Sequence, residues 1–96
     1  MPRRGGVRYP SWIRDRVEEL IVMKYEIILE ELERHGVYDI PRDSIENSYM
    51  RATLALKALH KAEKRWKEVV AKEPPEVRRA IAEMLLSLMS LVYGHE

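Results

Sequence analysis

The sequence predicts an all-α fold: one three-helix domain, in which a long antiparallel helical hairpin is joined to a third, apolar helix, with assembly into an oligomeric helical bundle. Two observations predict it. Apolar residues recur at three- or four-residue spacing through three long segments of the 96-residue chain. Each segment ends at residues that stop helices, which are Gly36, Pro74 and Gly94.

The first helix is expected over about residues 12–35. Pro10 and Ser11 supply a restricted turn and an N-cap before it. Gly36 is placed to adopt a left-handed C-cap conformation, and the segment that follows contains Pro41, which cannot continue the helix. The helix face expected in the core consists of Ile13, Val17, Leu20, Ile21, Ile27, Ile28 and Leu32.

The second helix is expected over about residues 44–72. Asp43, with Glu46 three residues later, forms a pattern typical of a capping box at its start. Pro74 and Pro75 end it. Its core face is expected to consist of Ile45, Tyr49, Ala52, Leu56, Leu59, Trp66 and Val70.

The third helix is expected over residues 75–93, because proline is favoured at the first helical position. Its second half is apolar almost all round, which is typical of a helix buried on several sides. We therefore expect self-association through this helix, with a dimer favoured; the alternative is the central helix of a monomeric bundle. The expected interface consists of Leu85, Leu86, Leu88, Met89 and Val92.

Length and composition define the class of protein. Residues 1–10 are expected to form a flexible basic arm and residues 11–96 a single domain. The chain has no cysteine, which excludes disulfides and thiolate zinc sites and favours a cytoplasmic location. It also lacks the long apolar run of a membrane span and the pattern of a secretory signal.

The amide content suggests a source. The chain has no Gln, one Asn and one Thr, while 34% of its residues are charged. This composition is typical of proteins from hyperthermophiles, so a thermophilic, archaeal source is our hypothesis. The alternative is that a short helical chain simply contains few amides.

Charge is sorted into blocks along the chain. Residues 1–16 hold five arginines and one acid, residues 17–39 two bases and seven acids, and residues 40–72 eight bases and four acids. The overall charge of +1 hides this alternation. Such asymmetry indicates a charged partner and does not determine the fold.

The basic arm is the first candidate site. Arg3, Arg4 and Arg8 can bind phosphates, while Tyr9 and Trp12 can stack on bases. The pattern therefore predicts contacts to nucleic acid. The alternative is a solvated tail, or an arm whose aromatic residues anchor it on protein.

A lysine stripe on the second helix is the other candidate. Its members lie at i, i+4 and i+7, with further bases beside them, and predict a phosphate-binding face. The alternative is that the stripe pairs with acids of the first helix, namely Glu26, Glu30 and Glu33. The stripe residues are Lys57, Lys61, Lys64 and Arg65, flanked by His60 and Lys67.

No motif with catalytic or metal-binding geometry accompanies these bases. His35, His60 and His95 lack ligand spacing, and the acids of the first helix lack a matching set on a second helix. We therefore expect no enzyme activity, metal, cofactor or small-molecule substrate. The leading hypothesis is a small nucleic-acid-binding or nucleoprotein-assembly protein that contacts the phosphate backbone non-specifically. The alternative is a helical protein–protein interaction module or a structural subunit of a larger complex.

Overall fold

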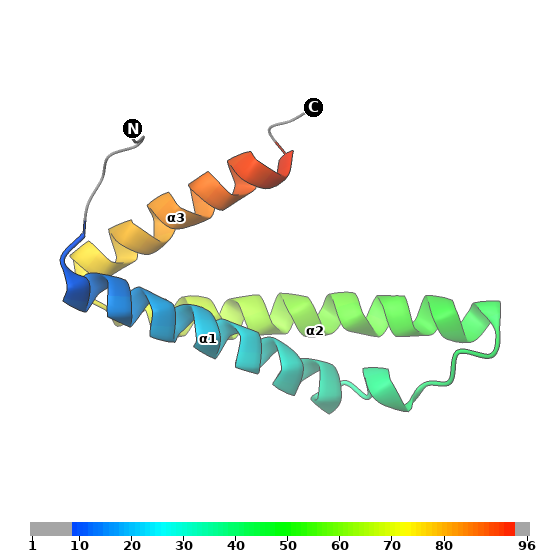
Figure 1. The fold of residues 1–96 in the computed structure, drawn as a ribbon. Helices are drawn as coiled ribbons and strands as arrows, with labels where there is room; N and C mark the ends of the chain where they lie inside the picture. The colour runs from blue at the N-terminus through cyan, green and yellow to red at the C-terminus, as the bar shows by residue number, and fades with distance from the viewer. Residues whose placement is uncertain (1–8, 94–96) are drawn as a thin grey trace. The chain divides into compact units, whose positions relative to one another are not determined.

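The computed structural model describes residues 9–93, and their side chains as far as residue 87. Three α-helices account for most of it: α1 (Ser11–Arg34), α2 (Ile45–Ala71) and α3 (Pro75–Tyr93) (Figure 1). A short 3-10 helix, η1 (Val37–Asp39), lies between α1 and α2. The described residues include no strand, so the predicted all-α, three-helix fold is confirmed, with each helix boundary within one residue of its prediction.

Several predicted site residues lie outside this description. They are Arg3, Arg4 and Arg8 of the arm and the side chains of Leu88, Met89 and Val92. Within the described part, no helix combines the length and the apolar character needed to cross a bilayer.

The boundaries of α1 follow the predicted signals. The Pro10 carbonyl accepts hydrogen bonds from the backbone N–H groups of Ile13 and Arg14, at 3.0 and 3.2 Å, so the helix begins at Ser11. At the other end, Gly36 has φ 72° and ψ 21°, the left-handed conformation predicted for it. A residue with a β-carbon adopts this conformation only with strain, so glycine allows the chain to leave the helix here.

The start of α2 differs by one residue from the predicted capping box. Ser44 is the N-cap: its Oγ accepts a hydrogen bond from the backbone N–H of Asn47 at 3.0 Å. Asp43 instead accepts a hydrogen bond from the side-chain amide of Asn47, at 2.7 Å. The extended backbone of Ser44 brings its hydroxyl to a helical N–H that has no partner within the helix, which is the role predicted for Asp43. As predicted, Pro75 opens α3.

The segment between α1 and α2 is fastened to α2 by one arginine. Arg51 donates hydrogen bonds from Nη1 to the carbonyls of Val37 and Ile40, at 3.0 and 2.8 Å. The Val37 side chain is buried. The connection is therefore held by backbone carbonyls that would otherwise need water as their partner.

The contacts divide the chain into two compact units. One unit contains the start of α1, to Leu20, and the chain from Glu73 onwards. Arg16 binds both carboxylate oxygens of Glu73 in this unit, through Nε at 3.0 Å and Nη2 at 2.6 Å. This hydrogen-bonded contact lowers the pKa of Glu73 and raises that of Arg16. The core of this unit consists of Ile13, Val17, Leu20, Val77, Ala80 and Ile81.

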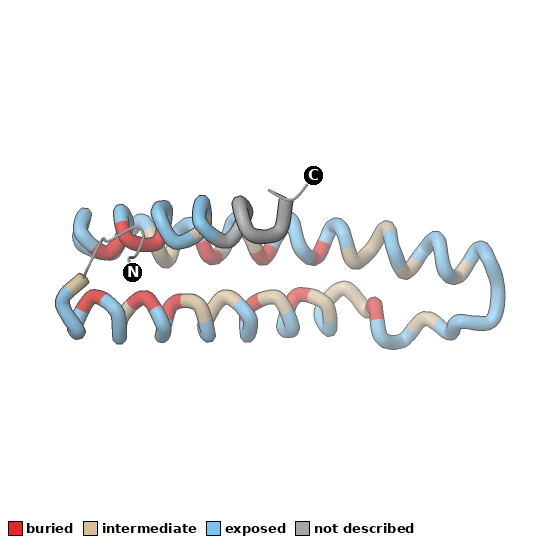
Figure 2. Tube along the Cα trace, turned by 45° about the horizontal axis from the view of Figure 1, so that its top comes forward, coloured by how far each residue is buried: buried red, intermediate tan, exposed pale blue. Residues whose placement is uncertain are grey.

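The second unit, Ile21–Lys72, contains the rest of α1 and all of α2. Lys24 lies with its Nζ 4.4 Å from the ring centroid of Trp66 and 3.2 Å from Glu63. The ring and the carboxylate thus both stabilise this half-buried cation. The core of this unit consists of Ile27, Glu31, Val37, Ala58, Ala62 and Trp66. Red in Figure 2 marks the buried positions of both units.

The predicted core face of α2 is largely wrong. Ile45 is 86% exposed, Tyr49 76% and Leu56 69%, and Ala52 and Leu59 are exposed as well. Of the predicted face, Trp66 is buried and Val70 half-buried. Instead, α2 turns a neighbouring face inward, where the small side chains of Ala58 and Ala62 permit close packing.

Candidate functional site

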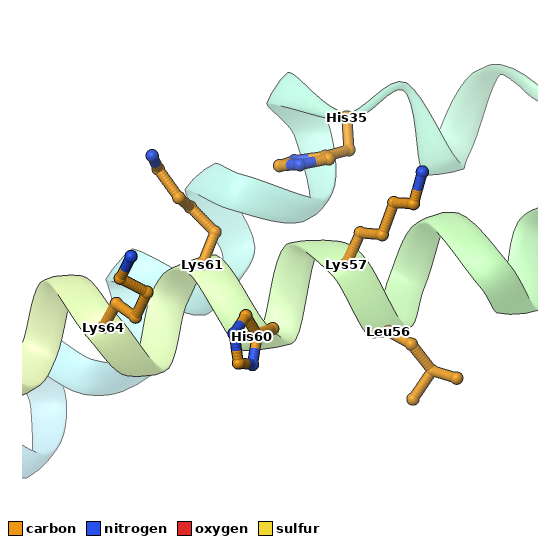
Figure 3. Close-up of a pocket in the computed structure, with 6 residues that line it drawn as sticks. All are labelled: His35, Leu56, Lys57, His60, Lys61 and Lys64. Atoms are coloured by element: carbon orange, nitrogen blue, oxygen red, sulfur yellow. The ribbon is translucent and has the colours of Figure 1, made fainter.

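A group of cationic side chains surrounds a shallow pocket of about 410 Å³ in the second unit. One lining residue, His35, directly follows α1, and the others lie on α2. The three lysines share one face of α2 because residues four and seven apart are neighbours on a helix. The pocket is lined by His35, Leu56, Lys57, His60, Lys61 and Lys64 (Figure 3).

The lysines and the histidine approach the pocket from two sides. Figure 3 shows Lys57 and Lys61 extending toward the side of α2 on which His35 lies, while Leu56 extends away from it. Lys57, Lys61 and Lys64 are exposed, and none of them forms an ion pair with any residue that the structure describes. Three lysines therefore line one shallow pocket without forming an ion pair to a described carboxylate.

The acids of α1 pair with an arginine instead. Arg65 Nη1 lies 2.8 Å from Glu30 Oε1 and 2.7 Å from Glu31 Oε2. The hydrogen bond that Arg65 donates to Glu30 contributes most to raising the pKa of Arg65, and the bond to Glu31 contributes next. Arg65, which the sequence placed in the phosphate-binding stripe, is thus half-buried and bound to two carboxylates.

Glu31 is a fully buried acid, with 0% of its surface exposed. Burial alone would raise its pKa, but the hydrogen bond from Arg65 and the charges of Arg34, Arg65 and His35 lower the pKa below its ordinary value. Arg34 contributes a contact of 2.9 Å. Glu31 is therefore held as a carboxylate among cations.

Glu31 also helps to place His35 at the pocket. His35 Nδ1 donates a hydrogen bond to the Glu31 backbone carbonyl at 2.9 Å, because a carbonyl can only accept. The same nitrogen lies 3.5 Å from Glu31 Oε1, an oxygen that accepts no hydrogen bond within the described residues. The imidazole is thus fixed at the end of α1, beside the lysines.

The remaining predicted site residues have separate surroundings. Tyr9 is half-buried, and its hydroxyl donates a hydrogen bond to Glu83, while Trp12 is 53% exposed. In the predicted oligomer interface, Leu85 is half-buried and Leu86 is 68% exposed. Of the predicted nucleic-acid contacts, the structure brings together Lys57, Lys61 and Lys64 at one pocket.

Sequence reasoning missed two residues that shape this site. His35 is distant from the lysines in sequence, and its spacing gives no sign that it joins them. Glu31 could have been found: it continues the buried series Val17, Leu20 and Ile27 at helical spacing, where a charged residue needs a partner.

The described part of the chain contains no group of three or more His, Cys, Asp or Glu residues placed to hold a metal ion. Neither protein-family models, nor curated protein sequences, nor solved structures give a match to this chain.

Proposed function

We propose that this protein binds the phosphate backbone of nucleic acid through Lys57, Lys61 and Lys64. One observation carries the proposal: these three lysines line one shallow pocket, and none of them forms an ion pair with a residue that the structure describes. Phosphate contacts by lysine require no particular base, so the binding is non-specific with respect to sequence.

The spacing of the lysines supports this assignment. Lys57 and Lys64 are separated by about 10 Å along the axis of α2, at about 1.5 Å per residue. Successive phosphates of one DNA strand rise about 3.4 Å each along the duplex axis, so an α2 lying parallel to that axis spans about three phosphate steps between these lysines. His35 and His60 supply further nitrogen atoms at the same surface.

The predicted arm remains part of the proposal. Arg3, Arg4 and Arg8 are its backbone contacts, and the exposed ring of Trp12 is available for base stacking. Arg65 is not among the proposed phosphate contacts, because a phosphate would have to displace Glu30 and Glu31 from it.

The test is fluorescence anisotropy with labelled duplex DNA, single-stranded DNA and RNA, repeated over a series of salt concentrations. Each lost phosphate contact should reduce the slope of log affinity against log salt by about 0.9 for duplex DNA, so replacing the three lysines with Gln should reduce it by about 3. The matched control replaces Lys72, Arg78 and Arg79, three exposed bases outside the pocket and the stripe, with Gln.

Equal losses in the two triple variants would mean that net charge, and not this pocket, determines binding. No binding by the unaltered protein at low salt would overturn the proposal. That second result would favour the alternative function, a helical protein–protein interaction module. The large exposed side chains of Ile45, Tyr49 and Leu56 are the observation that favours this alternative.

A further inference from the structure

We propose that α2 pairs in an antiparallel orientation with α2 of a second copy of this chain. The contact surface is a stripe of exposed residues, named here the outer seam. The outer seam consists of Ile45, Tyr49, Ala52, Leu56 and Leu59.

The outer seam has the spacing of a coiled coil. Its successive residues are four, three, four and three positions apart, which is the repeat that keeps one stripe of a helix against a partner helix. Ile45, Tyr49 and Leu56 are each more than two-thirds exposed, and Leu59 is 42% exposed. Three large apolar side chains on one stripe of one helix form a surface of the kind used for interaction.

A separate stripe of α2 already packs within the chain. Ala58 and Ala62 are buried, and they lie on a different face from the outer seam. A helix with two distinct apolar stripes can contact neighbours on two sides. The outer seam is therefore available to a partner while the packing of the second unit remains intact.

Four of the five seam residues pair with one another when the two copies are antiparallel, whereas Leu59 lies opposite residue 42, which precedes α2. With the two-fold axis between residues 50 and 51, Ile45 lies opposite Leu56 of the second copy. Tyr49 then lies opposite Ala52 of the second copy. The second pairing sets the large Tyr49 side chain against the small Ala52, and the first sets two aliphatic side chains against each other. The symmetric contact uses one patch twice, as two-fold dimers do.

Charge favours the same orientation. The start of α2 carries Asp43 and Glu46, whereas its second half carries Lys57, Lys61 and Lys64. An antiparallel pair brings Glu46 of one copy near Lys57 of the other, and it opposes the two helix dipoles favourably. A parallel pair would instead align the lysines of one copy with those of the other.

The area of the outer seam determines how stable a dimer we expect. Tyr49, at 76% exposed, presents on the order of 150 Å². The whole seam presents roughly 400 Å² per copy, about half of the ~800 Å² per partner found in stable complexes. We therefore expect a reversible dimer that dissociates on dilution.

The test is sedimentation velocity of the full chain, without nucleic acid, from about 1 μM to about 500 μM, a range that spans weak dimers. The unaltered protein should shift from monomer to dimer with rising concentration. Tyr49→Glu should remain monomeric, because it places a charge in the seam. The matched control is Met50→Glu, which introduces the same charge at the next exposed residue of α2, outside the seam. Far-UV circular dichroism confirms that both variants are helical.

Orientation is tested by cross-linking, since the chain has no cysteine of its own. A mixture of Ile45→Cys and Leu56→Cys chains should form the mixed disulfide. Ile45→Cys alone should not cross-link, because the two copies of residue 45 would lie about 16 Å apart along an antiparallel pair. Cross-linking of Ile45→Cys to itself would overturn the antiparallel arrangement.

Two other results would overturn the proposal. A strict monomer over the whole concentration range would leave the seam without a second copy. A dimer unaffected by Tyr49→Glu would place the contact elsewhere, for example on α3 as the sequence predicts. Leu56 lines the lysine pocket and also belongs to the outer seam, so the salt dependence of phosphate binding is measured in protein dilute enough to be monomeric.

Discussion

The two faces of α2 use apolar residues in opposite ways. The inner face, which packs within the second unit, buries Ala58, Ala62 and Trp66 and directs Arg65 to two carboxylates. The outer seam, with larger aliphatic and aromatic residues, remains exposed. The difference shows that side-chain fit and charge pairing, more than apolar bulk, select the face that α2 buries within the chain.

Glu31 illustrates this selection. A carboxylate is fully buried while Ile45 is 86% exposed, which reverses the usual order of these residue types. The reversal is possible because Arg65 and Arg34 lie at 2.7 and 2.9 Å from Glu31 and replace the water that it loses. Arg65 of the inner face is therefore paired with carboxylates of α1, and the lysines beside it are available to a partner.

The largest difference in stability is expected between two variants that each truncate one aromatic residue, one on the inner face and one in the outer seam. Trp66→Ala should lower the free energy of unfolding by about 3–5 kcal/mol, because it leaves a cavity and removes the ring beneath Lys24. Tyr49→Ala should change it by less than about 0.5 kcal/mol in dilute, monomeric protein. Urea denaturation followed by circular dichroism measures both. Comparable losses would show that the outer seam is buried within the monomer.

A smaller difference is expected between two bases of α2. Arg65→Ala should lower the Tm clearly, because it removes the strongest hydrogen-bond partner of the buried Glu31 carboxylate. Lys61→Ala, at an exposed position without an ion pair among the described residues, should leave the Tm almost unchanged. Differential scanning calorimetry at neutral pH compares them, and the comparison fails if the Lys61 variant melts as early as the Arg65 variant.

Acid should lower the free energy of unfolding, because it protonates carboxylates that are paired in the folded protein. The pKa of Glu31 is lower in the folded protein than the ordinary value of about 4.3 that applies to the unfolded chain. Its contribution to stability is therefore complete above that ordinary value and is lost as the pH falls through the folded pKa. Glu73, whose pKa is also lowered, acts in the same direction.

The Glu31→Gln variant isolates this contribution. It should be less stable than the unaltered protein at pH 7, and the gap between their Tm values should narrow below about pH 4. Glu33→Gln, at an exposed position of the same helix, should follow the unaltered protein at every pH. A gap that stays constant from pH 7 to pH 3 would contradict the ionised, paired state of Glu31.

The smallest difference in stability is expected between two serine variants at the start of α2, where the outer seam begins. Ser44→Ala should reduce stability by about 1 kcal/mol, because it removes the hydroxyl that caps the N–H of Asn47. Ser48→Ala, one turn into α2, should have little effect or slightly stabilise the helix, since Ala has the higher helix propensity. Thermal melts of the two variants provide the measurement. If both variants melt alike, the cap does not stabilise this end of α2.

Local signals in the sequence predicted the helices well. Gly36 and Pro75 act through their own backbone restrictions, so their effects can be read without knowing what lies nearby. The faces of α2 were not predictable in the same way. Both faces repeat at helical spacing, and the choice between them depends on the fit of Ala58 and Ala62 against other parts of the chain.

The candidate site was predictable in part for the same reason. The spacing of Lys57, Lys61 and Lys64 alone places them on one side of a helix. The position of His35 beside them depends on tertiary contacts, and so does the ion pair of Arg65 with Glu31. Helix periodicity carries no information about such contacts.

The hydrogen bonds of Arg51 have a consequence for the order of folding. They join α2 to carbonyls only 14 and 11 residues earlier in the chain, at Val37 and Ile40. Contacts over so short a separation cost little loop-closure entropy and favour rapid folding. We expect the connection between α1 and α2 to form early and to act as a nucleus from which the two helices extend.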